Sequence, residues 1–498
     1  MQSVGSAWLM VSLGASPLYV ALTQTASTLP FFLFALPAGA IGDIADRRRL
    51  ILYTESWMVG VAVVLAITTL TGVITPWLLL GLTFALSAGD AMETPTWRAV
   101  LPELVSKDDL AAASALNGIE FNLARAVGPA LAGALIAAAG VGAAFLVNVV
   151  SFLGVIVVVA RWKRPVRPRT TPAETLEGAT IAAIRYVRNA PVARAVMLRA
   201  GVVMFGASAL FALLPTVARA ISPSAIAYGL LLGAFGAGAI LGAIVMQRAR
   251  ARWSNEPVVS VAIAILGAST AAIAGIHALP LLLVVMAIAG GAWITFISLA
   301  NALVQTLAPD WVRARVLSIF MLITQGGLAG GSVVWGAIGS RVSVGAALLL
   351  SGLVTIATIA LGLVARLPDQ VADVSPWNHW PMPAILRNRA PGPDEGPVLV
   401  SIEYHVAPAR TRELLDAIQR YGPIRRRDGA SYWGVFRDLE QPDRYVESFL
   451  VASWGEHLRQ HERLTRADGA IEQEVRRYVQ DDPIVRHLIY AEPEDQRP

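Results

Sequence analysis

The sequence predicts an all-α membrane protein with two halves of six transmembrane helices each, followed by a small α+β domain. Three observations lead to this prediction. Apolar runs recur through the first 366 residues, and each is close to the roughly 20 apolar residues that a spanning helix needs. A sparse internal repeat relates the two parts of that region. After a proline-bearing linker, the hydrophobic pattern changes to that of alternating strands and amphipathic helices.

The composition agrees with a membrane protein. Of the 498 residues, 55% are hydrophobic and 15% are charged, whereas soluble domains carry about 25% charged residues. The chain has no cysteine, which excludes disulfides and thiol chemistry. The net charge of +5 does not indicate a nucleic-acid partner, because arginines between membrane spans account for it.

Hydropathy predicts twelve spans, and the basic residues between them predict their orientation. The spans are expected at 1–14, 18–44, 50–71, 76–98, 114–138, 141–161, 195–218, 226–248, 257–276, 279–303, 314–337 and 344–366. Lysine and arginine gather in every second link and after span six, whereas the other links are poor in them, with Arg219 and Arg341 as exceptions. The positive-inside rule therefore places the even-numbered links, the central loop and the tail in the cytoplasm.

The internal repeat has an offset of 203 positions. Gly39-Ala40-Ile41 recurs as Gly242-Ala243-Ile244, and the same offset relates Gly128 to Gly331 and Gly133 to Gly336. Span seven begins near Ala195, which maps before the first residue of the chain. We therefore expect the first helix to lack its opening turns, with a naturally short first helix as the alternative.

The soluble parts have their own patterns. The central loop has a basic stretch and then an amphipathic helix at 174–192, expected to lie along the membrane surface. Strands are expected at 398–406, 431–437, 445–452 and 486–491, and helices at 409–421, 454–463 and 468–480. This β-α-β-β-α-β order predicts a ferredoxin-like domain.

The expected division of the chain follows from these segments. It comprises an N-terminal six-helix half at 1–161, a cytosolic central loop at 162–194, a C-terminal six-helix half at 195–366, a linker at 367–397 and a ferredoxin-like cytosolic domain at 398–491.

A short loop between two apolar runs carries the most specific motif. Gly39 and Asp43 are followed by the basic cluster Arg47, Arg48 and Arg49. This arrangement resembles the loop between the second and third helices of the Major Facilitator Superfamily, from which it departs at Ile44 and Asp46. The resemblance implies the twelve-helix fold of that superfamily and a role for Asp43 in locking the closed cytosolic gate.

Two further segments resemble one branch of that superfamily. Thr94 to Val105, then Leu116-Asn117 and Asn122 to Gly133, are similar to the branch that contains the enterobactin exporters and the transmembrane secretion effectors. Gly128-Pro129 resembles the span-five motif of drug and proton antiporters, and this resemblance favours export over import. Small residues around that proline would also permit close helix packing.

Polar residues inside the spans are candidates for transport, because burying them in lipid is costly. Asp90 and Glu93 lie on one helical face, and any one of Asp90, Glu93 or Glu120 is a candidate proton carrier; ion pairing with Arg98 or Arg125 is the alternative. The candidate transport and gating residues are Gly39, Asp43, Arg47, Arg48, Arg49, Asp90, Glu93, Arg98, Asn117, Glu120, Arg125, Gly128 and Pro129. The candidate cavity residues are Trp97, Asn122, Trp293, Asn301 and Gln325, and core packing is the alternative for Trp293.

The tail resembles the antibiotic-biosynthesis monooxygenase type of domain, which commonly pairs into dimers. His457 and His461 lie four residues apart on one helix, a spacing that can bind zinc, but no third ligand accompanies them. We expect no metal site, no cofactor and no catalytic residues, and interpret the tail as a regulatory or dimerising module.

The sequence thus predicts a multi-pass transporter of the inner or plasma membrane that is not an enzyme. Its expected activity is export of a small organic molecule, a siderophore or a drug-like compound, by alternating access with protons as the coupling ion. The alternatives are an importer of the same fold and a membrane-tethered enzyme or sensor that acts through residues 398–491.

Overall fold

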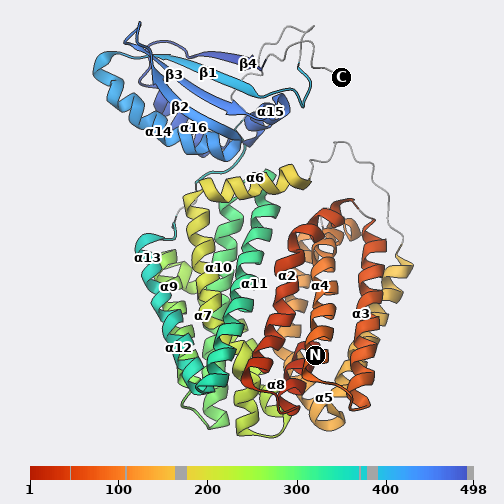
Figure 1. Cartoon of the computed structure of the whole chain (residues 1–498). Helices are drawn as coiled ribbons and strands as arrows, with labels where there is room; N and C mark the ends of the chain where they lie inside the picture. Colours follow the sequence, from red (N-terminus) through yellow and green to blue (C-terminus); the bar gives the residue numbers. More distant parts are fainter. Residues whose placement is uncertain (45, 107–108, 163–175, 370–371, 378–390, 491–498) are drawn as a thin grey trace. The chain divides into compact units, whose positions relative to one another are not determined.

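The computed structural model describes residues 1–44, 46–106, 109–162, 176–369, 372–377 and 391–490, and for part of the helices near residues 35–44 and 98–126 it describes the backbone alone (Figure 1). The chain divides into two compact units. Unit 1 comprises Met1–Pro172, Ala195–Ala302 and Ser318–Asp369, and unit 2 comprises Ala173–Arg194, Leu303–Leu317 and Gln370–Pro498.

Unit 1 is built from helices. They are α1 (Gln2–Ser12), α2 (Pro17–Ile44), α3 (Arg47–Leu70), α4 (Pro76–Leu104), α5 (Leu110–Arg161), α7 (Pro191–Ile221), α8 (Ala225–Arg250), α9 (Asn255–Ile273), α10 (Leu279–Leu307), α11 (Asp310–Arg341), α12 (Val344–Ala357) and α13 (Leu361–Val364), with the short 3₁₀ turn η1 (Thr358–Ala360) before α13. Gly140 has a φ of +81° inside α5, and this residue separates two helical segments where the sequence predicts a link between spans five and six.

Eight helices of the described residues are long and apolar enough to cross a membrane. One of them is Val127–Arg161, which comprises the end of the first segment of α5 and all of the second. Another is Val344–Val364, which comprises α12, η1 and α13. Large apolar side chains such as Val150, Val158 and Leu241 are exposed on the outer faces of these helices, 68%, 68% and 64% respectively. In a soluble protein such exposure would be unfavourable, but lipid contacts satisfy it.

Local sequence signals explain several helix ends. Asp46, which departs from the superfamily pattern, is the N-cap of α3, where its Oδ1 accepts a hydrogen bond from the backbone N–H of Arg49 at 2.9 Å. Thr75 caps α4 and Pro76 occupies its first turn, a position where a missing N–H has no cost. Arg48 donates through Nε to the carbonyl of Val159, at 3.1 Å, and through Nη2 to that of Ala160. These carbonyls lie in the last turn of α5, where that of Val159 also accepts from the backbone N–H of Trp162 at 3.2 Å. A cation is favourable at this end of a helix.

Unit 2 contains α6 (Leu176–Asn189) and a four-stranded antiparallel sheet with helices on one face (Figure 1). The strands are β1 (Val398–His405), β2 (Ala430–Arg437), β3 (Arg444–Val451) and β4 (Ile484–Ile489), in the order β2-β3-β1-β4. The helices are α14 (Thr411–Asp428), α15 (Trp454–Arg463) and α16 (Arg466–Arg476), with the 3₁₀ turn η2 (Pro408–Arg410) before α14. Every strand and helix predicted for the tail is present, although α14 ends seven residues later than expected and closes at Gly429.

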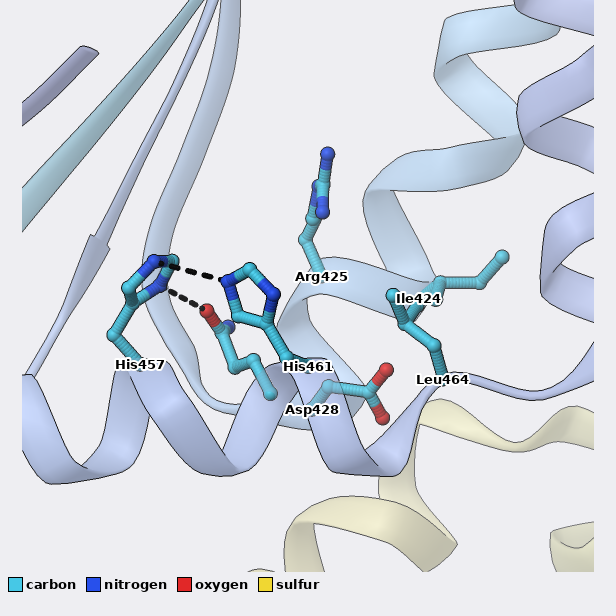
Figure 2. Close-up of a pocket in the computed structure, with 7 residues that line it drawn as sticks. Ile424, Arg425, Asp428, His457, His461 and Leu464 are labelled. Atoms are coloured by element: carbon cyan, nitrogen blue, oxygen red, sulfur yellow. Dashed lines mark hydrogen bonds between the residues drawn. The ribbon is translucent and has the colours of Figure 1, made fainter. Parts of the chain in front are cut away.

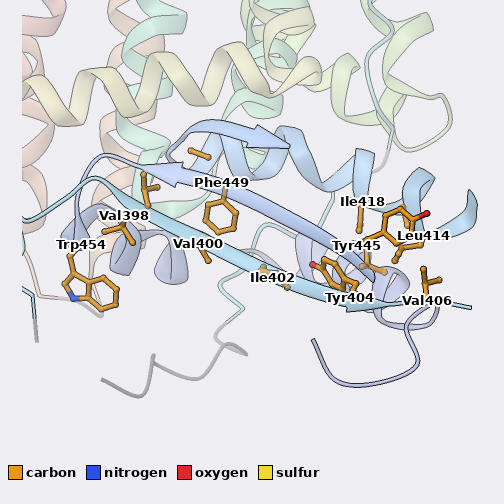
Figure 3. Packing of buried hydrophobic residues seen from close by; sticks show 14 residues of the cluster. Val398, Val400, Ile402, Tyr404, Val406, Leu414, Ile418, Tyr445, Phe449 and Trp454 are labelled. Carbon is orange, nitrogen blue, oxygen red and sulfur yellow. The ribbon is translucent and has the colours of Figure 1, made fainter. Parts of the chain in front are cut away.

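Alternation along β1 builds the core of the sheet. Val398, Val400, Ile402 and Tyr404 point to one face and pack against Phe449 of β3 and the helices (Figure 3). These residues are nearly fully buried, and burial of apolar side chains of this size contributes about 1.5–3 kcal/mol each. Among the described residues, nothing comparable covers the opposite face of the sheet, where Tyr432, Phe436 and Leu488 are exposed.

Candidate functional site

The two halves of unit 1 contact one another near one end of their helices. The contacts join the first half of α2 to the second half of α11, and the second half of the first α5 segment to the start of α8. The backbone N–H of Leu18 donates to Ser340 Oγ at 2.7 Å, and Thr25 Oγ1 donates to the carbonyl of Ala329 at 3.1 Å. This end carries the links 13–16, 71–75, 222–224 and 342–343, which we call the arginine-poor face.

Glycines make these contacts close. A Cβ placed on Gly133 would lie 2.8 Å from the carbonyl oxygen of Ala225, and one on Gly229 would lie 2.7 Å from that of Pro129. In the other contact, a Cβ on Gly336 would collide with Ala21. Gly133 and Gly336 are the pair that the offset of 203 positions relates, so both members of this repeated pair lie where the halves meet. Helices at this separation pack backbone against backbone, which small residues permit.

Aromatic and basic side chains close the same face beside α1. The ring of Trp8 stacks on Tyr228 of α8, with centroids 6.3 Å apart and planes 17° apart. The guanidinium of Arg219 lies 5.8 Å from the centroid of Trp8. The arginine-poor face is therefore held together by contacts from α1, α2, α5, α8 and α11.

A cluster of carboxylic acids lies between α3 and α4. Glu55 of α3 and Glu93 of α4 are 4% and 8% exposed, and their carboxyl groups adjoin one another. Thr54 Oγ1 donates a hydrogen bond to Glu93 Oε2 at 2.7 Å. Asp90 is exposed, and Thr94 Oγ1 donates to its Oδ1 at 3.3 Å.

The sequence interpretation named Asp90 and Glu93 but missed Glu55. Glu55 could have been selected from the sequence, because it is an acid inside the predicted span 50–71 and burying an acid in a membrane span is costly. The i, i+3 spacing selects two acids of the same helix, Asp90 and Glu93. The buried contact instead joins Glu55 of α3 to Glu93 of α4. Asp90 and Glu93 share a helix but differ in exposure.

The other predicted site residues fall into three groups. Gly39 and Asp43 lie in the last turns of α2, Arg98 near the end of α4, and Asn122 and Arg125 in α5; for these residues the structure describes the backbone alone. Trp97, Asn117 and Glu120 are exposed, and Gly128 and Pro129 are partly buried in α5. Asn301 of α10 and Gln325 of α11 are partly buried.

Trp293 of α10 lies in an aromatic cluster of the C-terminal half. Its ring centroid is 4.8 Å from that of Phe211 and 6.4 Å from that of Phe235. It is 7% exposed. This environment agrees with the alternative interpretation of Trp293 as a residue packed in the core.

A buried ion pair was not anticipated in the C-terminal half. Arg199 of α7 is 1% exposed, and its Nη1 lies 2.6 Å from Glu256 Oε2 at the start of α9. Glu256 also accepts from the backbone N–H of Leu367, at 2.9 Å. The pair therefore fastens the segment after α13 to α9.

Within unit 2, the tail contacts α6 and the turn between α10 and α11. Arg185 Nη2 of α6 lies 2.7 Å from Glu456 Oε1 of α15. Burial opposes ionisation of Glu456, but hydrogen bonds and charge from Arg463 and Arg185 outweigh it and hold its pKa below the usual range. Tyr186 donates its hydroxyl to the carbonyl of Leu307 at 2.6 Å.

Two aromatic contacts extend this docking. Tyr186 meets Trp311 of α11 edge to face, with centroids 6.1 Å apart, and the Arg463 guanidinium lies 4.7 Å from the centroid of Trp311. Burial raises the pKa of Tyr186 to about 12, so its hydroxyl remains a donor at physiological pH. The amphipathic pattern of α6 predicts a helix along the membrane surface, and nothing in that pattern indicates these contacts with the tail.

His457 and His461 of the tail line a small pocket (Figure 2). His461 Nε2 lies 3.3 Å from His457 Nε2, and His457 Nδ1 lies 3.2 Å from Gln460 Oε1. The pocket also includes Arg425 and Asp428, with a volume of about 10 Å³, space for about one water molecule. Burial, followed by the charge of neighbouring His461, lowers the pKa of His457 to about 3, and burial lowers that of His461 to about 4. In the part of the chain that the structure describes, no three ligand-type side chains are arranged to hold a metal ion.

Comparison with protein families gives one match along nearly the whole chain. The family described as transmembrane secretion effector matches residues 1–495. The chain is 27% identical over 329 residues to the multidrug efflux pump Tap of Mycolicibacterium fortuitum, which covers 63% of this chain and 78% of the pump. It is 28% identical over 292 residues to the enterobactin exporter EntS of Citrobacter koseri, covering 56% and 68% of the two chains.

A third relative is matched over a shorter region. The chain is 27% identical over 151 residues to the staphyloferrin A transporter of Staphylococcus aureus, which is 30% of this chain and 38% of that transporter. Solved structures with a similar fold include the nucleoside transporter NupG, with a TM-score of 0.61 and 13% identity over 74% of this chain and 95% of NupG. A bacterial homologue of the human lysosomal transporter Spinster gives a TM-score of 0.55 and 16% identity over 73% and 92% of the chains.

Proposed function

Because this chain belongs to the transmembrane secretion effectors of the major facilitator superfamily, we propose that it is a secondary active exporter of a small organic molecule. The relatives that support this cargo class are an enterobactin exporter and a multidrug efflux pump. The proposed cargo is therefore a siderophore or an amphipathic drug-like compound.

We propose that transport proceeds by alternating access between the two halves. The observation that carries this proposal is the glycine contact of α5 with α8, which closes the arginine-poor face through Gly133 and Gly229. A contact between nearly bare backbones can separate without breaking a network of side chains, and the repeated contact at Gly336 would open with it. The halves then expose a site near the midplane to each side in turn.

We propose protons as the coupling ion. Glu93 and Asp90 lie in the N-terminal half of unit 1, and intramembrane acids of this kind support proton exchange. Asp43 and Arg47 to Arg49 are proposed to latch the cytosolic end, and the proposed gate also includes Arg98, Asn117, Glu120, Arg125, Gly128 and Pro129. Trp97, Asn122, Asn301 and Gln325 are proposed to line the cavity with Trp293 behind them.

The finer architecture belongs to the same proposal. We propose twelve membrane-crossing helices in two halves, at 1–161 and 195–366, with the central loop at 162–194, the linker at 367–397 and a ferredoxin-like domain at 398–491. The strand order β2-β3-β1-β4 and the order of the elements in the tail support the ferredoxin-like assignment. Arginine-rich links support a cytoplasmic tail.

The open face of the tail sheet supports a proposed dimer. Tyr432, Phe436, Ile484 and Leu488 are each about half exposed on that face. Pairing of two such faces would remove these apolar side chains from water.

Efflux measurements test the proposed function. Cells that express the protein are loaded with ethidium or a catecholate siderophore, and efflux is followed before and after an uncoupler collapses the proton gradient. The proposal predicts efflux above that of cells without the protein, and its loss on uncoupling. Efflux that is equal with and without the protein contradicts export, and efflux that survives the uncoupler contradicts proton coupling.

A further inference from the structure

We propose that the coupling proton binds between Glu55 and Glu93, which share one proton across the interface of α3 and α4. This inference rests on the proposed proton-coupled export and identifies the residues at which the proton is held. It adds Glu55, and it separates the role of the buried pair from that of the exposed Asp90.

The buried pair has the geometry of a proton-sharing site. The two buried carboxyl groups adjoin one another, and two carboxyl groups can hydrogen-bond to each other only when one of them carries the proton. Thr54 donates to Glu93 Oε2 at 2.7 Å. Glu55 Oε2 is buried and has no hydrogen-bond partner, so this polar atom, in a side chain 4% exposed, remains available to bind a proton.

The charges around the pair are described only in part, because the side chain of Arg98 lies outside the described atoms. Among the described side chains, no ion pair includes Glu55 or Glu93. Arg48, at the start of the same helix as Glu55, donates its guanidinium hydrogens to the carbonyls of Val159 and Ala160 instead. Two carboxylates in contact and without a cation repel one another strongly where water is scarce, so the pair retains a proton until water or a conformational change separates it.

Asp90 gives the pair access to water. Asp90 and Trp97 are exposed and lie seven residues apart, so they share a face of α4. Gly81, exposed nearer the start of α4, lies nine residues before Asp90 and about half a turn away around the helix. The exposed surface of α4 thus changes sides along the helix, as expected for a helix that faces lipid near one end and a polar cavity near the other.

Proton release then changes the packing of α3 on α4. The proton leaves to water through the Asp90 face, and two carboxylates remain where one hydrogen-bonded pair had been. Their repulsion favours a conformation in which the pair is hydrated, while protonation favours the closely packed one. A single proton is bound and released in each cycle: an O–H bond forms on one carboxylate when the proton is taken up, and it breaks when the proton passes to water.

The test compares two transport modes in proteoliposomes with ethidium as the probe. Exchange of ethidium at equal pH on both sides requires no net proton movement, whereas accumulation driven by a pH gradient does. We expect Glu55→Gln and Glu93→Gln to keep exchange and to lose gradient-driven accumulation by about tenfold or more. Asp109→Asn, which changes an exposed acid in the link before α5, is the matched control and should keep both modes.

A third variant gives a readout that a merely structural role would not move. Thr54→Val removes the hydroxyl donor to Glu93 while preserving the shape of the side chain. Because that hydrogen bond favours the ionised carboxylate, gradient-driven accumulation should keep its maximum and shift its pH midpoint upward.

The outcomes separate this inference from the proposed function. If the wild-type protein accumulates the same amount of ethidium with and without a pH gradient, proton coupling itself is refuted. If the wild type is coupled and both glutamine variants remain coupled, the proton site is wrong while the exporter proposal stands. Loss of exchange in both glutamine variants together with an unchanged pH midpoint in Thr54→Val also overturns the proton site, because the residues would then serve structure alone.

Discussion

The closed contact at the arginine-poor face predicts the effect of a single methyl group. In Gly229→Ala, the added Cβ would lie 2.7 Å from the carbonyl oxygen of Pro129 and 3.0 Å from the Cα of Gly133. Non-bonded carbon contacts favour about 3.5–4.0 Å, so α5 and α8 would have to separate by a large part of 1 Å.

The magnitude of this effect follows from the cost of overpacking. Inserting a methyl group into a tightly packed contact costs about 1–3 kcal/mol. The cost falls on the conformation with the closed arginine-poor face, because the proposed alternating access separates these helices in the other conformation. The equilibrium should therefore move away from the closed face by roughly 5- to 150-fold.

Thiol labelling measures that shift, because the chain has no cysteine of its own. Thr25→Cys introduces one thiol at the α2–α11 contact, where Thr25 is partly buried and bonded to Ala329. Addition of Gly229→Ala should raise its labelling rate by a membrane-impermeant maleimide. Gly60→Ala is the matched control, because a Cβ there meets no atom within 4 Å. Equal labelling rates with and without Gly229→Ala would refute the reasoning.

Three further predictions concern unit 2. Arg185→Glu or Glu456→Arg alone should weaken docking of the tail on α6 by about 1 kcal/mol, and the double charge swap should recover part of this loss. Amide hydrogen exchange over residues 176–189 measures the docking. Equal amide exchange rates in all variants would contradict the contact. Arg425→Met should destabilise the tail by about 3–5 kcal/mol in chemical denaturation, because it removes the cation that pairs with the buried Glu447. Glu447 is 1% exposed, and its Oε1 lies 3.0 Å from Arg425 Nε. A loss below about 1 kcal/mol would show that the ion pair is dispensable. The pKa of His457 is lowered to about 3 and that of His461 to about 4, so the unfolded tail binds protons below pH 6.5 that the folded tail does not. Stability should therefore fall as the pH drops below about 6.5, by roughly 2 kcal/mol at pH 5 from each histidine. His457→Asn should remove about half of this dependence in melting curves, whereas an unchanged slope would exclude His457 as a source.

The sequence was sufficient to predict features that depend on the spacing of residues along the chain. The strands of the tail follow from alternation, as in Val398, Val400 and Ile402, which face one core. The offset of 203 positions selected Gly133 and Gly336, and both lie where the halves meet. Repeated glycines were informative here because a close approach of two helices constrains the residue type at a single position.

Contacts between distant elements could not be predicted in the same way. Glu55 lies 38 residues before Glu93 in the chain, and only the packing of α3 on α4 shows that the two acids meet. Arg185 and Glu456 are 271 residues apart, and neither has a local pattern that marks its partner. Asp46, read as a departure from a motif, acts as a helix cap, which its position before α3 explains.

The distance between the two halves at the arginine-poor face tests the account most directly. Spin labels on Val73→Cys and Val342→Cys, both exposed and in opposite halves, report this distance by pulsed electron resonance in the cysteine-free chain. The account predicts a short distance in the closed conformation and a second, longer population that grows when ethidium is added or the pH is changed. A single distance that neither ethidium nor pH alters would contradict a carrier whose halves move against each other.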